Sequence, residues 1–157
     1  MKDLFGIASV AALLLVLCGG FAVSTTHPVP EPPVQDEFEP IDNMHHFMEY
    51  ISQPSYLALK DALAAEPADR KAWKVVKSHA LILAETSALV AARVPDDMDE
   101  ELARQWKQTS LAVYGSGRDL YRSSGDYQQA REHYEAMIDN CNHCHQVFDE
   151  GRHQLEK

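Results

Sequence analysis

The chain is 157 residues long, which suits one modest domain with appendages and is enough to bury a core. Its 14 lysines and arginines against 24 aspartates and glutamates give a formal net charge of −10 at pH 7. This acidity argues against a surface for nucleic acid or for an anionic membrane, so we expect no nucleic-acid partner.

Residues 1–24 have the pattern of an export signal. A basic residue, Lys2, precedes an almost wholly apolar run, which is the order of a secretory signal peptide. Gly20 and Ala22 are small residues that suit cleavage after Ala22, whereas the length of the run equally suits an uncleaved membrane anchor. Cys18 adds a lipoprotein as a third alternative. In each case we expect a periplasmic or extracytoplasmic protein, soluble or tethered to the membrane by this segment.

Residues 25–40 contain five prolines among threonine, glutamate and aspartate. Such a segment cannot bury enough apolar surface to fold, so we expect a proline-rich linker. From about residue 41 the pattern becomes helical and stays so to about residue 150. We therefore expect a folded domain over 41–150, followed by a C-terminal tail over 151–157.

Two helices are expected in the first half of this domain. The first, over 41–65, has apolar residues at spacings of three and four, as in an amphipathic helix. These residues are Ile41, Met44, Met48 and Ile51. Pro54 should bend or interrupt this helix, because proline lacks an N–H and clashes with the preceding turn. Asp69 is the expected N-cap of the second helix, which should end near Arg93.

Two more helices are expected in the second half. Asp97 and Glu100 have the spacing of a capping box and predict the start of a third helix, whose inner face begins with Leu102. Asp126 and Gln129 have the same spacing and predict the start of a fourth. The fourth helix has the most regular apolar stripe in the chain, formed by Tyr127, Ala130, Tyr134, Met137, Cys141, Cys144 and Phe148.

This order of elements predicts an all-α fold. Four helices with short connections favour antiparallel neighbours, and hence an up-down-up-down four-helix bundle. Bundles of this kind can hold a cofactor between facing helices. The apolar stripe of the fourth helix contains two cysteines, so the expected place for a cofactor is near the C-terminal end of that helix.

The fourth helix carries the sequence Cys141-Asn142-His143-Cys144-His145. C-x-x-C-H is the attachment sequence of c-type haem, in which two thiols bond to the haem and the histidine supplies an axial nitrogen to the iron. Helical side chains three and four apart project to one side, so one helix face can hold the flat macrocycle. A zinc site is awkward, since adjacent helical residues diverge by about 100°. A thioredoxin-like redox pair would need a βαβ context. We expect one covalently attached haem c.

A four-helix pattern with this motif near the end of the last helix, behind an export signal, resembles the class II cytochromes c, the cytochrome c′ family. The resemblance covers residues 41–150. It rests on Cys141 and Cys144 as attachment points, His145 as the proximal iron ligand, Phe148 after the motif, and Trp73 with Leu83 in the second helix. The late position of the motif separates this family from class I cytochromes c. One departure is Asp149, which stands where the family often has a basic residue.

The resemblance implies an electron carrier that transfers single electrons, rather than an enzyme. Some members use a methionine of the first helix as sixth iron ligand, and Met48 lies about where those members have theirs. Met44 and His45 are alternative ligands, and Met48 can also be read as core packing. The partners implied are an unidentified redox protein and, as a family expectation, a second copy of the chain.

Two other functions stay open from the sequence. If the sixth position of the iron is open, the protein would bind NO or CO as a sensor or scavenger. A small peroxidase-like enzyme is a third reading, because His45 and Glu49 share a helix face and could serve as an acid–base pair.

Overall fold

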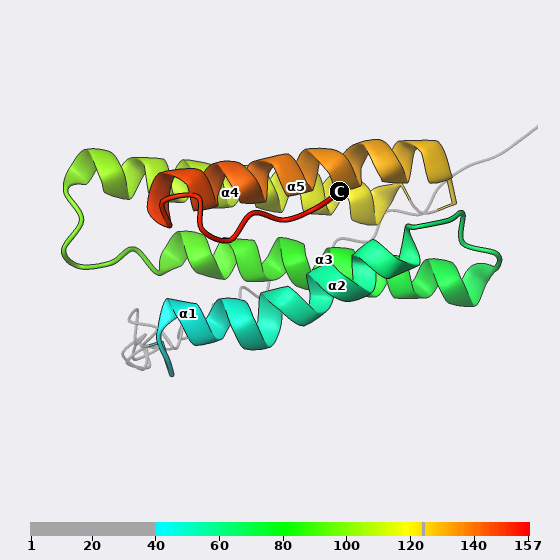
Figure 1. Cartoon of the computed structure of the whole chain (residues 1–157), viewed down its shortest axis with the longest axis horizontal. Coiled ribbons are helices and arrows are strands. Elements are labelled where there is room, and N and C mark those ends of the chain that lie inside the picture. The colour runs from blue at the N-terminus through cyan, green and yellow to red at the C-terminus, as the bar shows by residue number, and fades with distance from the viewer. Residues whose placement is uncertain (1–39, 124) are drawn as a thin grey trace, which may run out of the picture. The chain divides into compact units, whose positions relative to one another are not determined.

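The computed structural model describes residues 40–123 and 125–157, and all regular structure in these two ranges is helical (Figure 1). The all-α prediction is therefore confirmed for this part of the chain. The expected export signal, residues 1–24, and nearly all of the expected 25–40 linker lie outside the described residues.

The first predicted helix consists of three consecutive elements. These are α1 (Met44–Phe47), the π-helical turn η1 (Met48–Ser52) and α2 (Gln53–Ala62). The π turn ends just before Pro54, where the N–H of Gln53 donates to the Met48 carbonyl five residues back. Because Pro54 has no N–H to give, the irregularity expected there takes the form of this π turn.

Two of the apolar positions predicted for the inner face of this helix are wrong. Ile41 precedes the helix and is 98% exposed, and Ile51 is 41% exposed. Phe47 and Tyr56 are buried instead. The π turn holds more residues than an α turn, so a stripe extrapolated at α-helical spacing through Met48–Ser52 falls on the wrong face.

Helix α3 (Arg70–Ala92) begins and ends as predicted. The Asp69 side chain accepts a hydrogen bond from the N–H of Ala72 at 2.8 Å, and Arg93 is the C-cap. By length and composition, α3 is the one helix in the described ranges that could cross a membrane. Core helices meet the same criterion, and α3 supplies fully buried Val76 and Ala80 to the core.

Helix α4 (Glu100–Arg122) has a different cap from the predicted one. The Asp99 side chain accepts from the N–H of Leu102 at 2.8 Å, whereas Asp97 lies in a turn closed by the N–H of Met98 on the Pro95 carbonyl. The expected capping box at Asp97 and Glu100 is therefore wrong. Leu102 is 40% exposed, which also corrects its assignment to the inner face.

Helix α5 (Tyr127–Phe148) begins as predicted, since the Asp126 side chain accepts from the N–H of Gln129 at 3.0 Å. Close backbone contacts join α2 to α3, α3 to α4, and α4 to α5. Side chains from all four fill the main core, and its fully buried members include Leu59, Leu63, Val76, Ala80, Leu120, Ala130, Tyr134, Met137 and Ile138.

After α5 the chain reverses and runs back along that helix (Figure 1). The reversal uses positive φ angles at Glu150 (54°) and Gly151 (72°), and the N–H of Gly151 donates to the His145 carbonyl at 3.0 Å. A Cβ on Gly151 would also lie 2.7 Å from the Gln146 amide oxygen, so this turn favours glycine. The C-terminal tail is therefore packed against the helices.

Candidate functional site

A cavity of about 680 Å³ lies between the helical segments, within the volume range of small-molecule and cofactor pockets. One wall comes from the first helical segment, which comprises α1, η1 and α2, and contains Met44, His45, Met48, Glu49, Ser52, Gln53 and Tyr56. A second comes from α3, the loop after it and α4, and contains Leu83, Ser87, Val90, Pro95, Met98, Trp106, Ser110 and Val113. The third comes from α5 and the chain after it, and contains Met137, Ile138, Cys141, Cys144, His145, Phe148, Asp149, His153 and Leu155. Most of these side chains are apolar. Such a cavity would exclude water from a flat apolar ligand.

The two motif cysteines both line this cavity. They are three residues apart on α5, and therefore on one side of it. The Thr109 hydroxyl of α4 donates to the Cys144 sulfur at 3.7 Å. Both residues are partly buried and both line the space between the helices, as thioether attachment to a ligand in the cavity would require.

Burial governs the acidity of these thiols. It raises the pKa of Cys141 to about 12, with a further contribution from the nearby Cys144, and it raises the pKa of Cys144 against the opposing hydrogen bond from Thr109. Redox-active and nucleophilic cysteines have lowered pKa values. The shift here is in the opposite direction, which disfavours the thioredoxin-like alternative.

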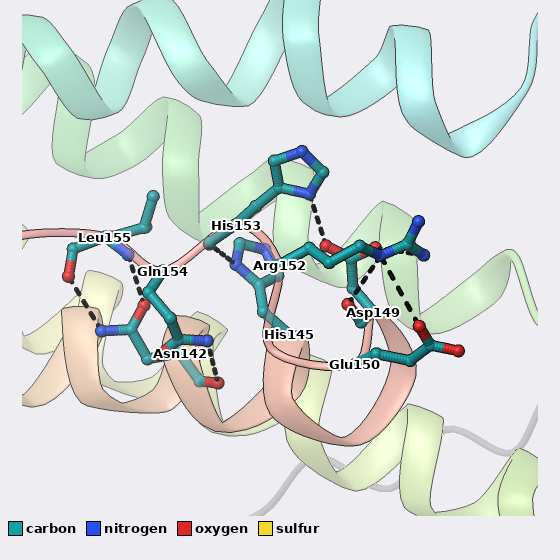
Figure 2. A network of polar contacts seen from close by, with 8 residues as sticks. All are labelled: Asn142, His145, Asp149, Glu150, Arg152, His153, Gln154 and Leu155. Atoms are coloured by element: carbon teal, nitrogen blue, oxygen red, sulfur yellow. Dashed lines mark hydrogen bonds and ion pairs between the residues drawn. The ribbon is translucent and has the colours of Figure 1, made fainter.

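His145 lines the same cavity, and its ring is held by the C-terminal tail. Nδ1 lies 2.5 Å from the carbonyl oxygen of His153, a contact drawn in Figure 2. A carbonyl can only accept, so Nδ1 carries a hydrogen, and in the neutral imidazole Nε2 is then the nitrogen with the lone pair. Metal-binding histidines typically have this arrangement, with one nitrogen donating to a carbonyl or carboxylate and the other free for the metal.

These residues fit a c-type haem. Two partly buried thiols and the His145 imidazole line one mainly apolar cavity, and all three come from the last third of α5. Among the described residues there is no cluster of three or more His, Cys, Asp or Glu side chains arranged to hold a bare metal ion. The geometry therefore suits a macrocycle better than the zinc alternative.

All three candidates for a sixth ligand line the cavity from the first helical segment. Met44 and Met48 pack against the cluster formed by Phe47, Val90 and Trp106. The side chain of His45 is 72% exposed, and its Nε2 lies 3.5 Å from the Glu49 carboxylate. Met44 and Met48 thus lie in apolar surroundings, while His45 and Glu49 lie at the solvent edge.

Sequence reasoning missed Met98, which lines the cavity and packs against the same Phe47, Val90 and Trp106 cluster. Met98 lies in the loop between α3 and α4, where helical periodicity assigns no inner face. A methionine directly before the capping residue Asp99 was the one available signal, because loops of a bundle cover the ends of its core.

The aromatic residue after the motif also closes the cavity. The Phe148 ring meets the Trp106 ring edge-on, with centroids 5.1 Å apart and an interplanar angle of 71°. Trp73, which entered the resemblance with Leu83, packs on the main core and does not line the cavity, whereas Leu83 does.

The charged residues near the motif are paired with one another. Asp149 contacts the His153 side chain and lies 3.0 Å from Arg152, and the hydrogen bond from His153 lowers the pKa of Asp149. Lys60 lies 2.6 Å from Glu156. The basic residues Arg152 and Lys60 therefore both have carboxylate partners.

No protein-family model matches the chain, and no match is found among curated proteins or among solved structures.

Proposed function

We propose that this protein is an exported c-type cytochrome, similar to the class II cytochromes c, that holds one covalent haem and transfers single electrons. The observation that carries the proposal is the meeting of Cys141, Cys144 and His145 at one mainly apolar cavity. A short C-x-x-C-H match can arise by chance, but a chance match would not be expected to open onto a space of about 680 Å³.

In this proposal the bundle is antiparallel, up-down-up-down. Contacts between neighbouring helices support it. Trp106 near the start of α4 contacts Val90 near the end of α3, while Gly117 further along α4 lies against Ala84 further back on α3. Likewise Thr109 contacts Cys144 late in α5, and Ser116 contacts the earlier Asn140.

Each residue would have a distinct role. The Cys141 and Cys144 thiols would form thioethers that retain the group in both redox states, and Nε2 of His145 would be the proximal ligand. The haem would supply the one-electron chemistry. The surrounding apolar side chains, among them Val113 and Met137, would keep water out and thereby influence the potential.

Met48 is the proposed sixth ligand. Its thioether lies on the cavity wall contributed by the first helical segment, and its surroundings are apolar. Ligation by both Met48 and His145 would favour electron transfer over ligand exchange, because it would leave no iron position open. The electron would pass to or from a separate redox protein on the outer side of the cytoplasmic membrane, and the chain would not be an enzyme.

The test is the absorption spectrum of the full chain made with a haem-attachment system, ferric and reduced, with and without CO. Covalent haem, visible as a mass increase of one haem that survives denaturation, is expected in the wild type and not in the Cys141→Ala/Cys144→Ala variant. A low-spin reduced spectrum little changed by CO is expected for an electron carrier. If no haem is attached under conditions that mature a control cytochrome, the proposal is wrong.

The methionines of the cavity wall are also compatible with a second function, the binding of NO or CO. Met44, Met48 and Met98 are flexible side chains that can repack, so an open sixth position with room for a diatomic gas is compatible with the same walls. In that case the reduced spectrum would be high-spin and would shift on addition of CO.

A further inference from the structure

Asn142 is one of the two residues between the motif cysteines, a position with no part in covalent attachment. Its side-chain amide forms two hydrogen bonds with one residue of the C-terminal tail, as Figure 2 shows. The amide nitrogen donates to the Leu155 carbonyl at 2.9 Å, and the amide oxygen accepts from the Leu155 N–H at 2.6 Å. An asparagine side chain paired in this way fixes both the position and the direction of the backbone that it contacts.

The carbonyl that accepts from His145 lies two residues before Leu155. It belongs to His153, and the chain between His153 and Leu155 is too short to move independently of either end. Asn142 and His145 are themselves one turn apart on α5. One turn of α5 therefore carries the His145 ring and, through Asn142 and Leu155, also holds the His153 carbonyl that the ring contacts.

The tail is also anchored beyond Leu155. The hydroxyls of Tyr56 and Tyr134 donate to the Glu156 carbonyl at 3.1 and 3.4 Å, and the N–H of Glu156 donates to the Tyr56 hydroxyl at 3.0 Å. Tyr56 belongs to α2 and Tyr134 to α5. The tail thus bridges the two helices at the cavity, and Leu155 packs against the core between them.

We propose that Asn142 is a positioning residue for the proximal ligand, acting through Leu155 to hold the His153 carbonyl on Nδ1 of His145. This rests on the proposed function. The hydrogen bond keeps the hydrogen on Nδ1, fixes the plane of the ring and increases electron density on Nε2, which favours the ferric over the ferrous state. The tail acts through its backbone, so the identity of the side chain at position 153 matters little to this contact.

The experiment compares Asn142→Ala with His143→Ala in the haem-loaded full chain. His143 is the other residue between the motif cysteines and is exposed, so its replacement controls for any change within the motif. Two quantities are measured for each variant: the reduction potential, and the exchange rate of the Nδ1 proton of His145 with solvent by NMR.

Loss of the contact in Asn142→Ala should raise the potential. Outer-shell partners of ligating histidines change affinity by about 10-fold or more, and a 10-fold change in the ferric-to-ferrous preference is about 59 mV for one electron. The Nδ1 proton should exchange faster than in the wild type. His143→Ala should leave both quantities unchanged.

Truncation after Arg152 removes the tail, leaves the sequence of the motif unchanged and should reproduce the effect of Asn142→Ala. It also keeps the test decisive if Asn142→Ala does not accumulate. Haem attached normally, with potential and exchange rate unchanged in both Asn142→Ala and the truncated chain, would overturn the inference and leave the proposed function intact. Absence of haem in the wild type would overturn both.

Discussion

The indole nitrogen of Trp106 donates a hydrogen bond to the Val90 carbonyl at 2.7 Å, joining the start of α4 to the last turn of α3. Trp106 is 6% exposed, and its other edge meets Phe148 at the end of α5. One side chain therefore connects three helices at the wall of the cavity. The size and shape of the cavity depend on this connection, because Trp106, Val90 and Phe148 all line it.

Replacing Trp106 by phenylalanine should lower the free energy of unfolding by about 1–2 kcal/mol, because the hydrogen bond is lost and the smaller ring leaves part of its site unfilled. Denaturation in urea measures the change. Leu102→Ala is the matched control on the same helix, since its side chain is 40% exposed and should alter stability by less than about 0.5 kcal/mol. Equal effects of the two substitutions would contradict the role assigned to Trp106.

Gly117 of α4 lies in close contact with Ala84 of α3. A Cβ added there would lie 3.2 Å from the Ala84 Cβ and 3.3 Å from the Ala84 backbone. Gly117→Ala should therefore destabilise the protein by about 1–3 kcal/mol through overpacking. Gly115→Ala, two residues earlier, meets nothing within 4 Å and should instead stabilise the helix by about 0.4–1 kcal/mol. A stabilising Gly117→Ala would mean that the two helices separate easily.

The helical class of the fold could be predicted because each helix carries its own local signals. Asp69 and Asp126 cap the helices that they were expected to cap, and the α5 stripe from Ala130 to Met137 is fully buried. Errors occur where two local signals compete. Asp97 and Asp99 are both good capping residues, and the turn closed by Met98 on Pro95 decides in favour of the second.

The candidate site was only partly predictable for a related reason. The C-x-x-C-H motif identifies Cys141, Cys144 and His145 as candidates from the sequence alone, because attachment of a c-type haem requires this spacing. The contact of the His153 carbonyl with His145 involves a backbone atom. It lies in a segment without hydrophobic periodicity, so neither the residue types nor their spacing predicts it. Met98 was missed because its place on the cavity wall depends on how a loop folds over the helix ends.

The raised thiol pKa values predict a pH effect on the chain made without haem. The thiols ionise near pH 9.0 when unfolded, whereas the pKa of Cys141 is raised to about 12 by burial in the folded chain. Over this range the folded state binds more protons than the unfolded state, so stability should fall as pH rises from about 9 toward 12. Urea denaturation at a series of pH values measures the slope.

The Cys141→Ala/Cys144→Ala variant is the control for this slope. Tyr134 also has a pKa raised to about 12, chiefly by burial, and contributes in part of the same range. The slope should therefore become shallower in the variant but not vanish. An identical slope in variant and wild type would show that the thiols are not buried in the folded chain.

The last prediction concerns the sixth ligand. Met44, Met48, Met98 and His45 all reach the cavity, so position on its wall does not select among them. Met48→Ala should convert the reduced haem-loaded protein from low-spin to high-spin and open it to rapid CO binding, because a filled axial position becomes free. Its potential should fall, since a methionine ligand raises the potential of a haem.

Met44→Ala and Met98→Ala are matched controls, as both residues pack on the same Phe47, Val90 and Trp106 cluster and their loss disturbs the cavity to a similar extent. They should leave the protein low-spin. His45→Ala should do so too, because that side chain is largely exposed. A low-spin spectrum that persists in Met48→Ala but is lost in one of the other three would assign the ligand to that residue. A wild type that is already high-spin would favour the gas-binding function instead, since an unligated iron needs no methionine to leave before CO binds.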